Sequence, residues 1–284
     1  MNRIFRLFNE LLLITLVTGC NPAGQHKKTE NSVAKANAAV VKDSIAINQV
    51  PNSTAQVCAK TEVPILCFHR IGLDRKSAYE VTPETFEADM KILADSGYHS
   101  VMPSQLYDYL VYNKPLPEKP VMITFDDSRA EHFRIAAPVM EKYGFRGVFF
   151  IMTITYNKKN YMTTEQIAQL SKAGHCIGLH SWDHVMVTKY KNEDDWQKEV
   201  ADPKKKLEKI LNGPVEYWAY PYGIFNHSSA GELSKYFKLS FSLSTQRDST
   251  LPLQTVRRMV VPSWTPQELL ISMHKTFNKV NRPK

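Results

Sequence analysis

The sequence has few cysteines, no long apolar run and no internal repeat. Its N-terminal apolar run, residues 11–17, is much shorter than the roughly 20 residues of a membrane-spanning helix, which argues against a transmembrane anchor. No nucleic-acid-binding motif accompanies the formal charge of +8, and the lysines are dispersed or gathered on one expected helix, residues 194–211. The basic balance therefore indicates a solvated face, or attraction to an anionic envelope, rather than a nucleic-acid partner.

The first residues have the features of an export signal. Arg3 and Arg6 precede the short apolar run, as in signal peptides. The run ends in Val17-Thr18-Gly19-Cys20, which resembles the lipobox cleaved by the bacterial lipoprotein signal peptidase. This resemblance implies that residues 1–19 are removed and that Cys20 carries the lipid, so the protein is exported and lipid-anchored to the bacterial cell envelope, on the periplasmic or outer-membrane side. An ordinary signal peptide with an incidental cysteine is the alternative.

Residues 20–60 are expected to form a lipidated cysteine and a flexible tether. From residue 21 to about residue 57 the chain has no aromatic residue, so it buries too little apolar surface to offset the entropy of ordering. With Cys20 assigned to the lipid, Cys58, Cys67 and Cys176 remain, and they allow at most one internal disulfide. The sequence does not rank the pairings, and buried free thiols are equally consistent with it.

The remaining segment, residues 61–284, alternates short apolar runs with longer amphipathic stretches, the pattern of parallel strands joined by helices. The expected strands are residues 63–68, 121–125, 147–152, 176–179, 217–220 and 239–243. The expected helices are residues 83–96, 104–111, 129–143, 164–173, 194–211, 229–237 and 266–277. About seven β/α units without an internal repeat predict one α/β domain, built as a barrel or as an open doubly wound sheet.

Two carboxylates stand at the end of one expected strand. Asp126 and Asp127 directly follow the apolar residues 121–125, and α/β folds place their sites at the carboxyl ends of parallel strands. As an alternative, one of the two aspartates caps the next helix. Adjacent carboxylates repel each other, however, unless a cation or a bound proton relieves the repulsion, which favours a chemical role.

Two histidines follow another expected strand at a spacing that suits one metal ion. The stretch is His180-Ser181-Trp182-Asp183-His184, directly after residues 176–179. With a strand-end aspartate, the two imidazoles form a set that leaves coordination positions free for water and substrate, as catalytic metal sites require. The sequence thus predicts a metal-dependent hydrolase, in which one aspartate ligates the metal and the other takes a proton.

The two motifs together resemble a known enzyme family. Thr124-Phe125-Asp126-Asp127 and the stretch from His180 to His184 are similar to the first two motifs of the NodB-homology polysaccharide deacetylases, carbohydrate esterase family 4. Pro64-Ile65-Leu66-Cys67-Phe68-His69, Val81-Thr82-Pro83-Glu84-Thr85-Phe86 and Ala219-Tyr220-Pro221-Tyr222-Gly223 resemble the subgroup that includes poly-N-acetylglucosamine deacetylases. The resemblance spans roughly residues 60–275 and implies a distorted (β/α) barrel.

The resemblance also implies roles for single residues. Asp127, His180 and His184 would hold one divalent ion, zinc or else cobalt, nickel or iron, and Asp126 would be the general base. The backbone N–H of Tyr222 would stabilise the oxyanion, and His69 would be the general acid that protonates the leaving nitrogen. For His69 the alternative is a strand-end histidine that bonds a backbone carbonyl.

Two positions depart from the family pattern. The first motif commonly ends in glycine, where this chain has Ser128, which could alter the turn beside the metal. The third motif often begins with an arginine that pairs with the base, where this chain has Ala219. Another residue must then orient Asp126, and Arg257 and Arg258 are candidates by charge alone.

The expected function is removal of N-acetyl groups from N-acetylglucosamine units of an envelope or extracellular polysaccharide. The lipid on Cys20 would hold the enzyme at the membrane. The first alternative keeps the same machinery but hydrolyses O-acetyl esters of xylan or another glycan. The second is a glycan-binding lipoprotein without turnover.

Overall fold

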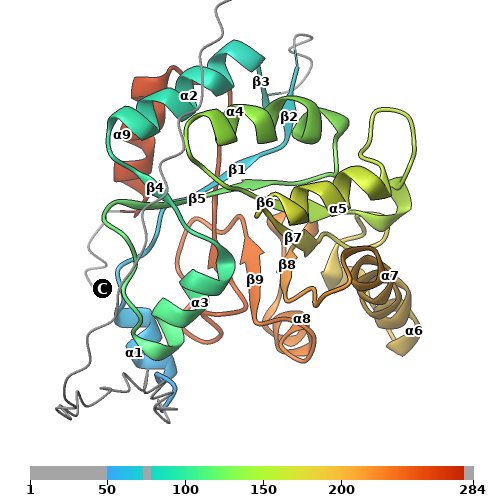
Figure 1. The fold of residues 1–284 in the computed structure, drawn as a ribbon. Coiled ribbons are helices and arrows are strands. Elements are labelled where there is room, and N and C mark those ends of the chain that lie inside the picture. Colours follow the sequence, from blue (N-terminus) through green and yellow to red (C-terminus); the bar gives the residue numbers. More distant parts are fainter. Residues whose placement is uncertain (1–49, 73–77, 278–284) are drawn as a thin grey trace, which may run out of the picture. The chain divides into compact units, whose positions relative to one another are not determined.

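The computed structural model describes residues 50–72 and 78–277, and its centre is a parallel sheet (Figure 1). The strands lie in the order β10-β9-β8-β7-β6-β5-β1-β11, with β4 beside β5, and neighbouring strands run parallel. Their bounds are β1 Ile65–Phe68, β4 His99–Ser100, β5 Pro120–Phe125, β6 Val148–Ile151, β7 Cys176–Leu179, β8 Tyr217–Ala219, β9 Leu239–Ser242, β10 Val256–Arg257 and β11 Met259–Val260. This arrangement confirms the predicted α/β class.

One short segment brings the two edges of the sheet together. β10 pairs with β9 and β11 pairs with β1, and only Arg258 separates β10 from β11 in the chain. The Arg258 N–H donates to the Ser242 carbonyl, and the Val261 N–H donates to the Cys67 carbonyl, so each ladder continues past the strand. The sheet therefore forms a nearly closed barrel, as the family resemblance implies, and not an open doubly wound sheet.

Helices connect the strands and cover the outside of the barrel. Their bounds are α1 Thr54–Ala59, α2 Pro83–Asp95, α3 Pro103–Tyr112, α4 Ala137–Lys142, α5 Thr164–Lys172, α6 Glu193–Trp196, α7 Asp202–Leu211, α8 His227–Leu233 and α9 Pro266–Phe277. Helix α2 packs against both α4 and α9, and α5 packs against α7 (Figure 1). Two short strands, β2 (Arg70–Ile71) and β3 (Glu80–Val81), pair separately from the barrel.

Side chains alternate along each strand between the barrel interior and the helical shell. On β6, Val148 and Phe150 belong to the interior apolar cluster, whereas Phe149 and Ile151 pack with the surrounding helices. Apolar residues of α1 and α3 join the interior cluster, next to residues that precede the strands. The N-terminal end of the barrel is thus filled with apolar side chains, and polar side chains occupy the C-terminal ends of the strands.

Two of the predicted helices contain a π-helical stretch. Residues 129–143 contain the π-helical stretch η1 (His132–Ala136) before α4, and residues 194–211 contain the π-helical stretch η4 (Gln197–Ala201) between α6 and α7. A proline, Pro138 or Pro203, follows each π-helical stretch within two residues, and its ring would clash with the carbonyl four residues earlier in a regular α-helix. The two predicted helices are thus confirmed, and each contains a π-helical stretch that the sequence analysis did not specify.

The folded domain begins earlier than the predicted boundary at residue 61. Residues expected in the tether form helix α1, whose Val57 is buried in the interior cluster. The Arg247 guanidinium donates to the carbonyls of Val57, Cys58 and Lys60 at the C-terminal end of this helix. The tether prediction was wrong for this segment, because the composition of residues 20–60 does not reveal its contact with Arg247, which lies far along the chain.

The predictions for residues 1–49, among them the signal peptide and the lipid on Cys20, lie outside the described residues. Within residues 50–72 and 78–277, no helix combines the length and the apolar character needed to span a bilayer. Cys58, Cys67 and Cys176 are free thiols in the structure, so none of the pairings left open by the sequence is formed.

Candidate active site

The expected site residues gather at the C-terminal ends of three strands. Asp126 and Asp127 follow β5, His180 and His184 follow β7, and His69 follows β1. Strand β5 pairs with β1 on one side and with β6 on the other, and β6 in turn pairs with β7. The barrel therefore brings together motifs that are more than fifty residues apart in the chain.

Asp127, His180 and His184 form one compact cluster of possible metal ligands. The Nε2 atoms of the two histidines are 3.1 Å apart, and Asp127 Oδ1 lies 3.7 Å from the His180 Nε2 and 3.6 Å from the His184 Nε2. Ligands that bind zinc tetrahedrally at about 2.0–2.1 Å lie about 3.3 Å from one another. The three side chains are thus spaced as the ligands of one divalent ion.

Hydrogen bonds and burial prepare both imidazoles for this role. His180 is buried and its Nδ1–H donates to the Ala219 carbonyl at 2.8 Å, which leaves the Nε2 lone pair directed at the cluster. Burial, and then the neighbouring His180, lower the pKa of His184 to about 4, although Asp127 opposes the shift. His184 is therefore neutral at pH 7, as a metal ligand must be.

The backbone around the cluster adopts a conformation that most residues avoid. Asp127, Ser128, Ser181 and His184 have φ angles of 74°, 59°, 65° and 74°. The left-handed conformation costs roughly 1–2 kcal/mol for each such residue. The Ser181 hydroxyl accepts a hydrogen bond from the His184 N–H at 2.8 Å, which helps to hold the turn that returns His184 to His180.

Ser128 stands where the resembled family commonly has glycine, and its side chain has a structural use here. The residue is buried, and its hydroxyl accepts a hydrogen bond from the Met152 N–H at 2.7 Å, just past the end of β6. Glycine would adopt the left-handed backbone at less cost but could not make this bond. The substitution therefore leaves the turn beside Asp127 in place.

Asp126 is buried and paired with Arg258. The Arg258 Nη1 lies 2.7 Å from Asp126 Oδ1, and its Nη2 lies 2.8 Å from Oδ2. Burial by itself raises the pKa of Asp126, but Arg258, together with His180 and His69, brings the pKa well below its ordinary value. Asp126 is thus an ionised carboxylate in a fixed orientation.

Of the two arginines proposed to orient Asp126, only Arg258 contacts it. Arg257 forms a bidentate ion pair with Glu62 at 2.6 Å, elsewhere in the domain. Successive side chains of an extended strand point in opposite directions, so only one of the two neighbours can enter the barrel. The sequence could not choose between them because it does not specify which face of the closing segment is the interior.

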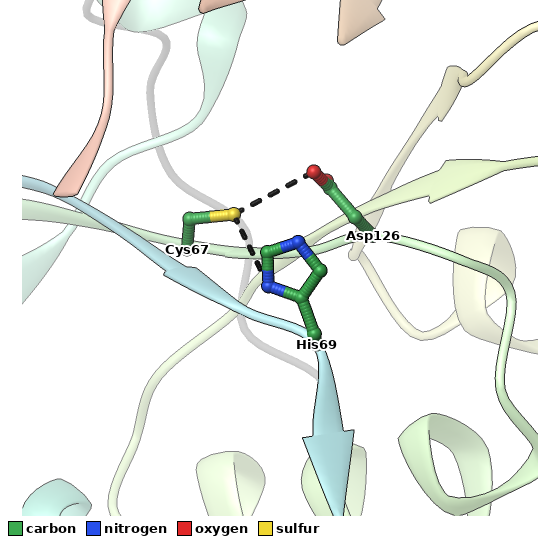
Figure 2. A group of neighbouring side chains, drawn as sticks. All are labelled: Cys67, His69 and Asp126. Carbon is green, nitrogen blue, oxygen red and sulfur yellow. Dashed lines mark hydrogen bonds between the residues drawn. The ribbon is translucent and has the colours of Figure 1, made fainter. Parts of the chain in front are cut away.

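His69 and Cys67 lie close to Asp126 in the structure (Figure 2). The Cys67 Sγ lies 3.5 Å from Asp126 Oδ2 and 3.9 Å from His69 Nδ1. Cys67 was not among the expected site residues. The alternation of β1 contained the signal, because Cys67 and His69 are two residues apart and so share the interior face.

Tyr222 lies at the solvent-exposed edge of the cluster. Its ring centroid is 4.4 Å from that of His184, and its backbone is left-handed with a φ of 60°. The side chain is 59% exposed, so it borders the opening rather than filling it. The ring of Tyr222 is therefore next to one of the candidate ligands, His184.

Comparison with known sequences identifies related proteins. The family model described as polysaccharide deacetylase matches residues 113–237. The Bacillus subtilis protein YxkH, described as a polysaccharide deacetylase, is 31% identical over 168 residues, which cover 59% of each chain. The poly-β-1,6-N-acetyl-D-glucosamine N-deacetylase of Staphylococcus aureus is 25% identical over 181 residues, 58% of this chain and 61% of that protein. The chain thus spans about 60% of the length of these curated relatives.

Comparison with solved structures identifies the same fold. The Streptococcus pyogenes deacetylase PplD aligns with a TM-score of 0.69 and 24% identity, over 75% of this chain and 98% of that one. The structure of IcaB from Ammonifex degensii aligns with a TM-score of 0.61 and 26% identity, over 75% of this chain and 96% of that one. The barrel described above is therefore the NodB-type deacetylase fold, as the sequence resemblance predicts.

The Arg258→Met variant is expected to reverse the pH dependence of stability. In the wild type, the pKa of Asp126 is lower in the folded than in the unfolded protein, where it is about 3.9. The ionised carboxylate therefore stabilises the fold above pH 4, and this stabilisation is lost as the pH falls through the folded-state pKa. Without the guanidinium, burial raises the Asp126 pKa, so stability falls as the pH rises above about 4, with a loss of ~3–5 kcal/mol at neutral pH. Urea unfolding of the metal-free protein across this range measures the effect. Arg257→Met is the control, and an Arg258→Met slope equal to that of Arg257→Met would contradict the assignment.

Two substitutions of Ser128 are expected to differ in stability. Ser128→Ala keeps the left-handed strain and leaves the Met152 N–H without its partner, which costs about 1–3 kcal/mol. Ser128→Gly loses the same hydrogen bond but relieves roughly 1 kcal/mol of backbone strain, so its loss of folding stability is smaller. Urea unfolding of both variants tests this order, and a glycine variant less stable than the alanine variant would refute it.

Proposed function

Because the chain carries a polysaccharide deacetylase domain of the NodB type, we propose that it is a metal-dependent hydrolase that removes N-acetyl groups from a polysaccharide containing N-acetylglucosamine. The observation that carries the proposal is the cluster of Asp127, His180 and His184 beside a carboxylate that Arg258 keeps ionised. The likeness to the Staphylococcus aureus N-deacetylase supports the proposed substrate class.

The donor set fits a divalent ion of the zinc class. Two imidazoles and one carboxylate suit Zn²⁺, and also Co²⁺, Ni²⁺ or Fe²⁺, and leave positions open for water and substrate. Asp127, His180 and His184 would hold the ion. When bound, it would supply a Lewis acid for the acetyl carbonyl and would lower the pKa of water.

We assign Asp126 to take the proton from the attacking water. Its Oδ2 lies 3.9 Å from the His180 Nε2, so the carboxylate borders the ligand cluster without belonging to it. Arg258 holds both oxygens and keeps the carboxylate charged at neutral pH, which is the form that accepts a proton. The pair therefore serves both as the base and as its support.

We assign His69 to donate a proton to the leaving nitrogen. An amine leaves readily only when it is protonated, and His69, directly after β1, has a ring nitrogen within 4.8 Å of an Asp126 carboxylate oxygen. The pKa of His69 is lowered, chiefly by burial, although Asp126 and Asp127 oppose the shift. The Tyr222 N–H, at the edge of the cluster, is assigned to stabilise the oxyanion of the tetrahedral intermediate.

An O-acetyl esterase acting on xylan or another glycan is the alternative enzyme. It would use the same residues, but an alkoxide leaves with less help from an acid than an amine does. The position of His69 next to Asp126 favours the amide substrate, since only that reaction depends strongly on a second proton-transfer group. A glycan-binding lipoprotein without turnover would need neither Asp126 nor its buried partner Arg258, and their pairing argues against that alternative.

We further propose that the enzyme is exported and lipid-anchored through Cys20 to the bacterial cell envelope, on the periplasmic or outer-membrane side. The support is the sequence of residues 1–20, with two arginines, a short apolar run and a lipobox-like ending. The acetylated polysaccharide and the membrane would then be its partners, without a role for nucleic acid.

Variants of the two adjacent aspartates are expected to separate metal binding from turnover. Asp126→Asn should retain the metal and lose at least about 100-fold of the activity, because the amide cannot accept the proton. Asp127→Ala should lose both metal and activity, because it removes a ligand. Metal analysis of the purified variants by mass spectrometry decides between these outcomes. A metal-loaded Asp127→Ala protein would overturn the assignment of roles.

Acetate release from N-acetylglucosamine oligomers, with and without added Zn²⁺ or Co²⁺, tests the function itself. We expect acetate release to depend on the metal. The His69→Asn variant should release acetate from the amide substrate about 100-fold or more slowly than the wild type, with a clearly smaller decrease for an O-acetyl ester. His99→Asn, at the opposite end of the barrel, is the matched control. No release with any metal would reject the N-deacetylase, and release from the ester alone would favour the esterase.

The Cys20→Ser variant is expected to lose membrane attachment. A lipid chain supplies about 0.8 kcal/mol for each buried methylene, which no side chain of the tether replaces. Fractionation of bacterial cells that express the wild type or the variant measures the membrane-bound share of each. Equal membrane association of both proteins would exclude the anchor.

A further inference from the structure

Cys67 stands inside the candidate active site without a part in the proposed reaction. Its side chain is fully buried, and its thiol donates to Asp126 Oδ2 at 3.5 Å (Figure 2). The same Sγ lies 3.9 Å from His69 Nδ1. The thiol therefore bridges the two residues that the proposed chemistry uses for proton transfer.

Cys67, His69 and Asp126 together have the composition of a site for a borderline-soft metal. Thiolate, imidazole and carboxylate are the three side-chain donors that Zn²⁺ binds, and their ligand atoms lie within 4.8 Å of one another. In tetrahedral zinc sites sulfur lies about 3.5 Å from the oxygen or nitrogen of a second ligand, from bond lengths of about 2.3 Å and 2.0–2.1 Å. The observed 3.5 Å and 3.9 Å are close to this value.

The ion pair with Arg258 limits the strength of such a site but does not occupy it. Each Asp126 oxygen accepts one bond from the guanidinium, and a carboxylate oxygen has a second lone pair, which on Oδ2 receives the thiol proton. An ion would take the place of that proton, which passes to the solvent as the thiolate forms. Two effects weaken binding of the ion: the positive charge of Arg258 repels it, and burial raises the pKa of the Cys67 thiol, so the thiol is harder to deprotonate. This site should therefore fill after the cluster of Asp127 and the two histidines.

We propose that Cys67, His69 and Asp126 form a second, weaker site for Zn²⁺ and related ions, and that its occupation inhibits the enzyme. The inhibition rests on the proposed function, because the ion would hold both the base and the acid. The binding of the ion does not rest on it. Ions that prefer oxygen ligands, such as Mg²⁺ and Ca²⁺, should neither bind nor inhibit here.

Cobalt titration of the metal-free full chain tests the binding directly. The first equivalent should bind without a thiolate-to-cobalt charge-transfer band in the near ultraviolet, because the primary cluster has no sulfur ligand. The second equivalent should produce this band. In Cys67→Ser, which keeps a hydrogen-bond donor for Asp126, the band should disappear while the first equivalent still binds.

A chain with serine at Cys20, Cys58 and Cys176 is the matched control, because Cys67 is then its only thiol. It should keep the band in full. Absence of the band in the wild type at any cobalt concentration would overturn the proposal, and so would a band that persists in Cys67→Ser. Neither result depends on whether the protein releases acetate.

Activity measurements test the inhibitory role. Excess Zn²⁺ should suppress acetate release by the wild type and leave Cys67→Ser largely unaffected, whereas excess Mg²⁺ should suppress neither. Activation of the wild type by the second equivalent would overturn the inhibitory role while leaving the site itself in place. A protein without any acetate release would reject the proposed function, and the cobalt band would still decide the binding.

Discussion

The ion pair between Arg258 and Asp126 connects the segment that closes the barrel to the candidate active site. Arg258 is the residue at which the closing segment passes from β10 to β11, and its guanidinium reaches across the interior to Asp126. Neither charge could be buried alone without a large loss of stability. The Phe150 ring lies 5.3 Å from the guanidinium, and Gly178 makes room for that ring, since an added Cβ would meet it at 2.5 Å.

Around this pair, the backbone is strained where the side chains have to converge. Several residues with left-handed backbone lie in the turns that follow β5, β7 and β8. They are Asp127, Ser128, Ser181, His184 and Tyr222. Local hydrogen bonds, such as those accepted by the Ser128 and Ser181 hydroxyls, offset part of the cost. Strain held in this way is common at functional sites, where geometry matters more than local stability.

Elements with a strong local signal could be predicted from the sequence. The apolar run of β7 and the proline-started helix α9 have the predicted bounds, Cys176–Leu179 and Pro266–Phe277. The two-residue strands β10 and β11 were missed, because so short a strand shows no alternation of apolar and polar residues. Helix α1 was missed because its support comes from Arg247, far along the chain. Of the site, the ligand cluster and the shared face of Cys67 and His69 could be predicted. The choice of arginine and the contact of Cys67 with Asp126 could not.

The sequence by itself determined the types and spacing of the site residues, because paired carboxylates and histidines after apolar strands are local patterns that belong to a known family. Only the tertiary structure decided that Arg258 and not Arg257 supports Asp126, and that Cys67 contacts Asp126 as well as His69. The physical reason is that barrel closure and strand register are set by backbone hydrogen bonds between residues far apart in the chain. The alternation along a strand shows which of its own residues share a face, but which residues of different strands meet in the interior follows from that pairing.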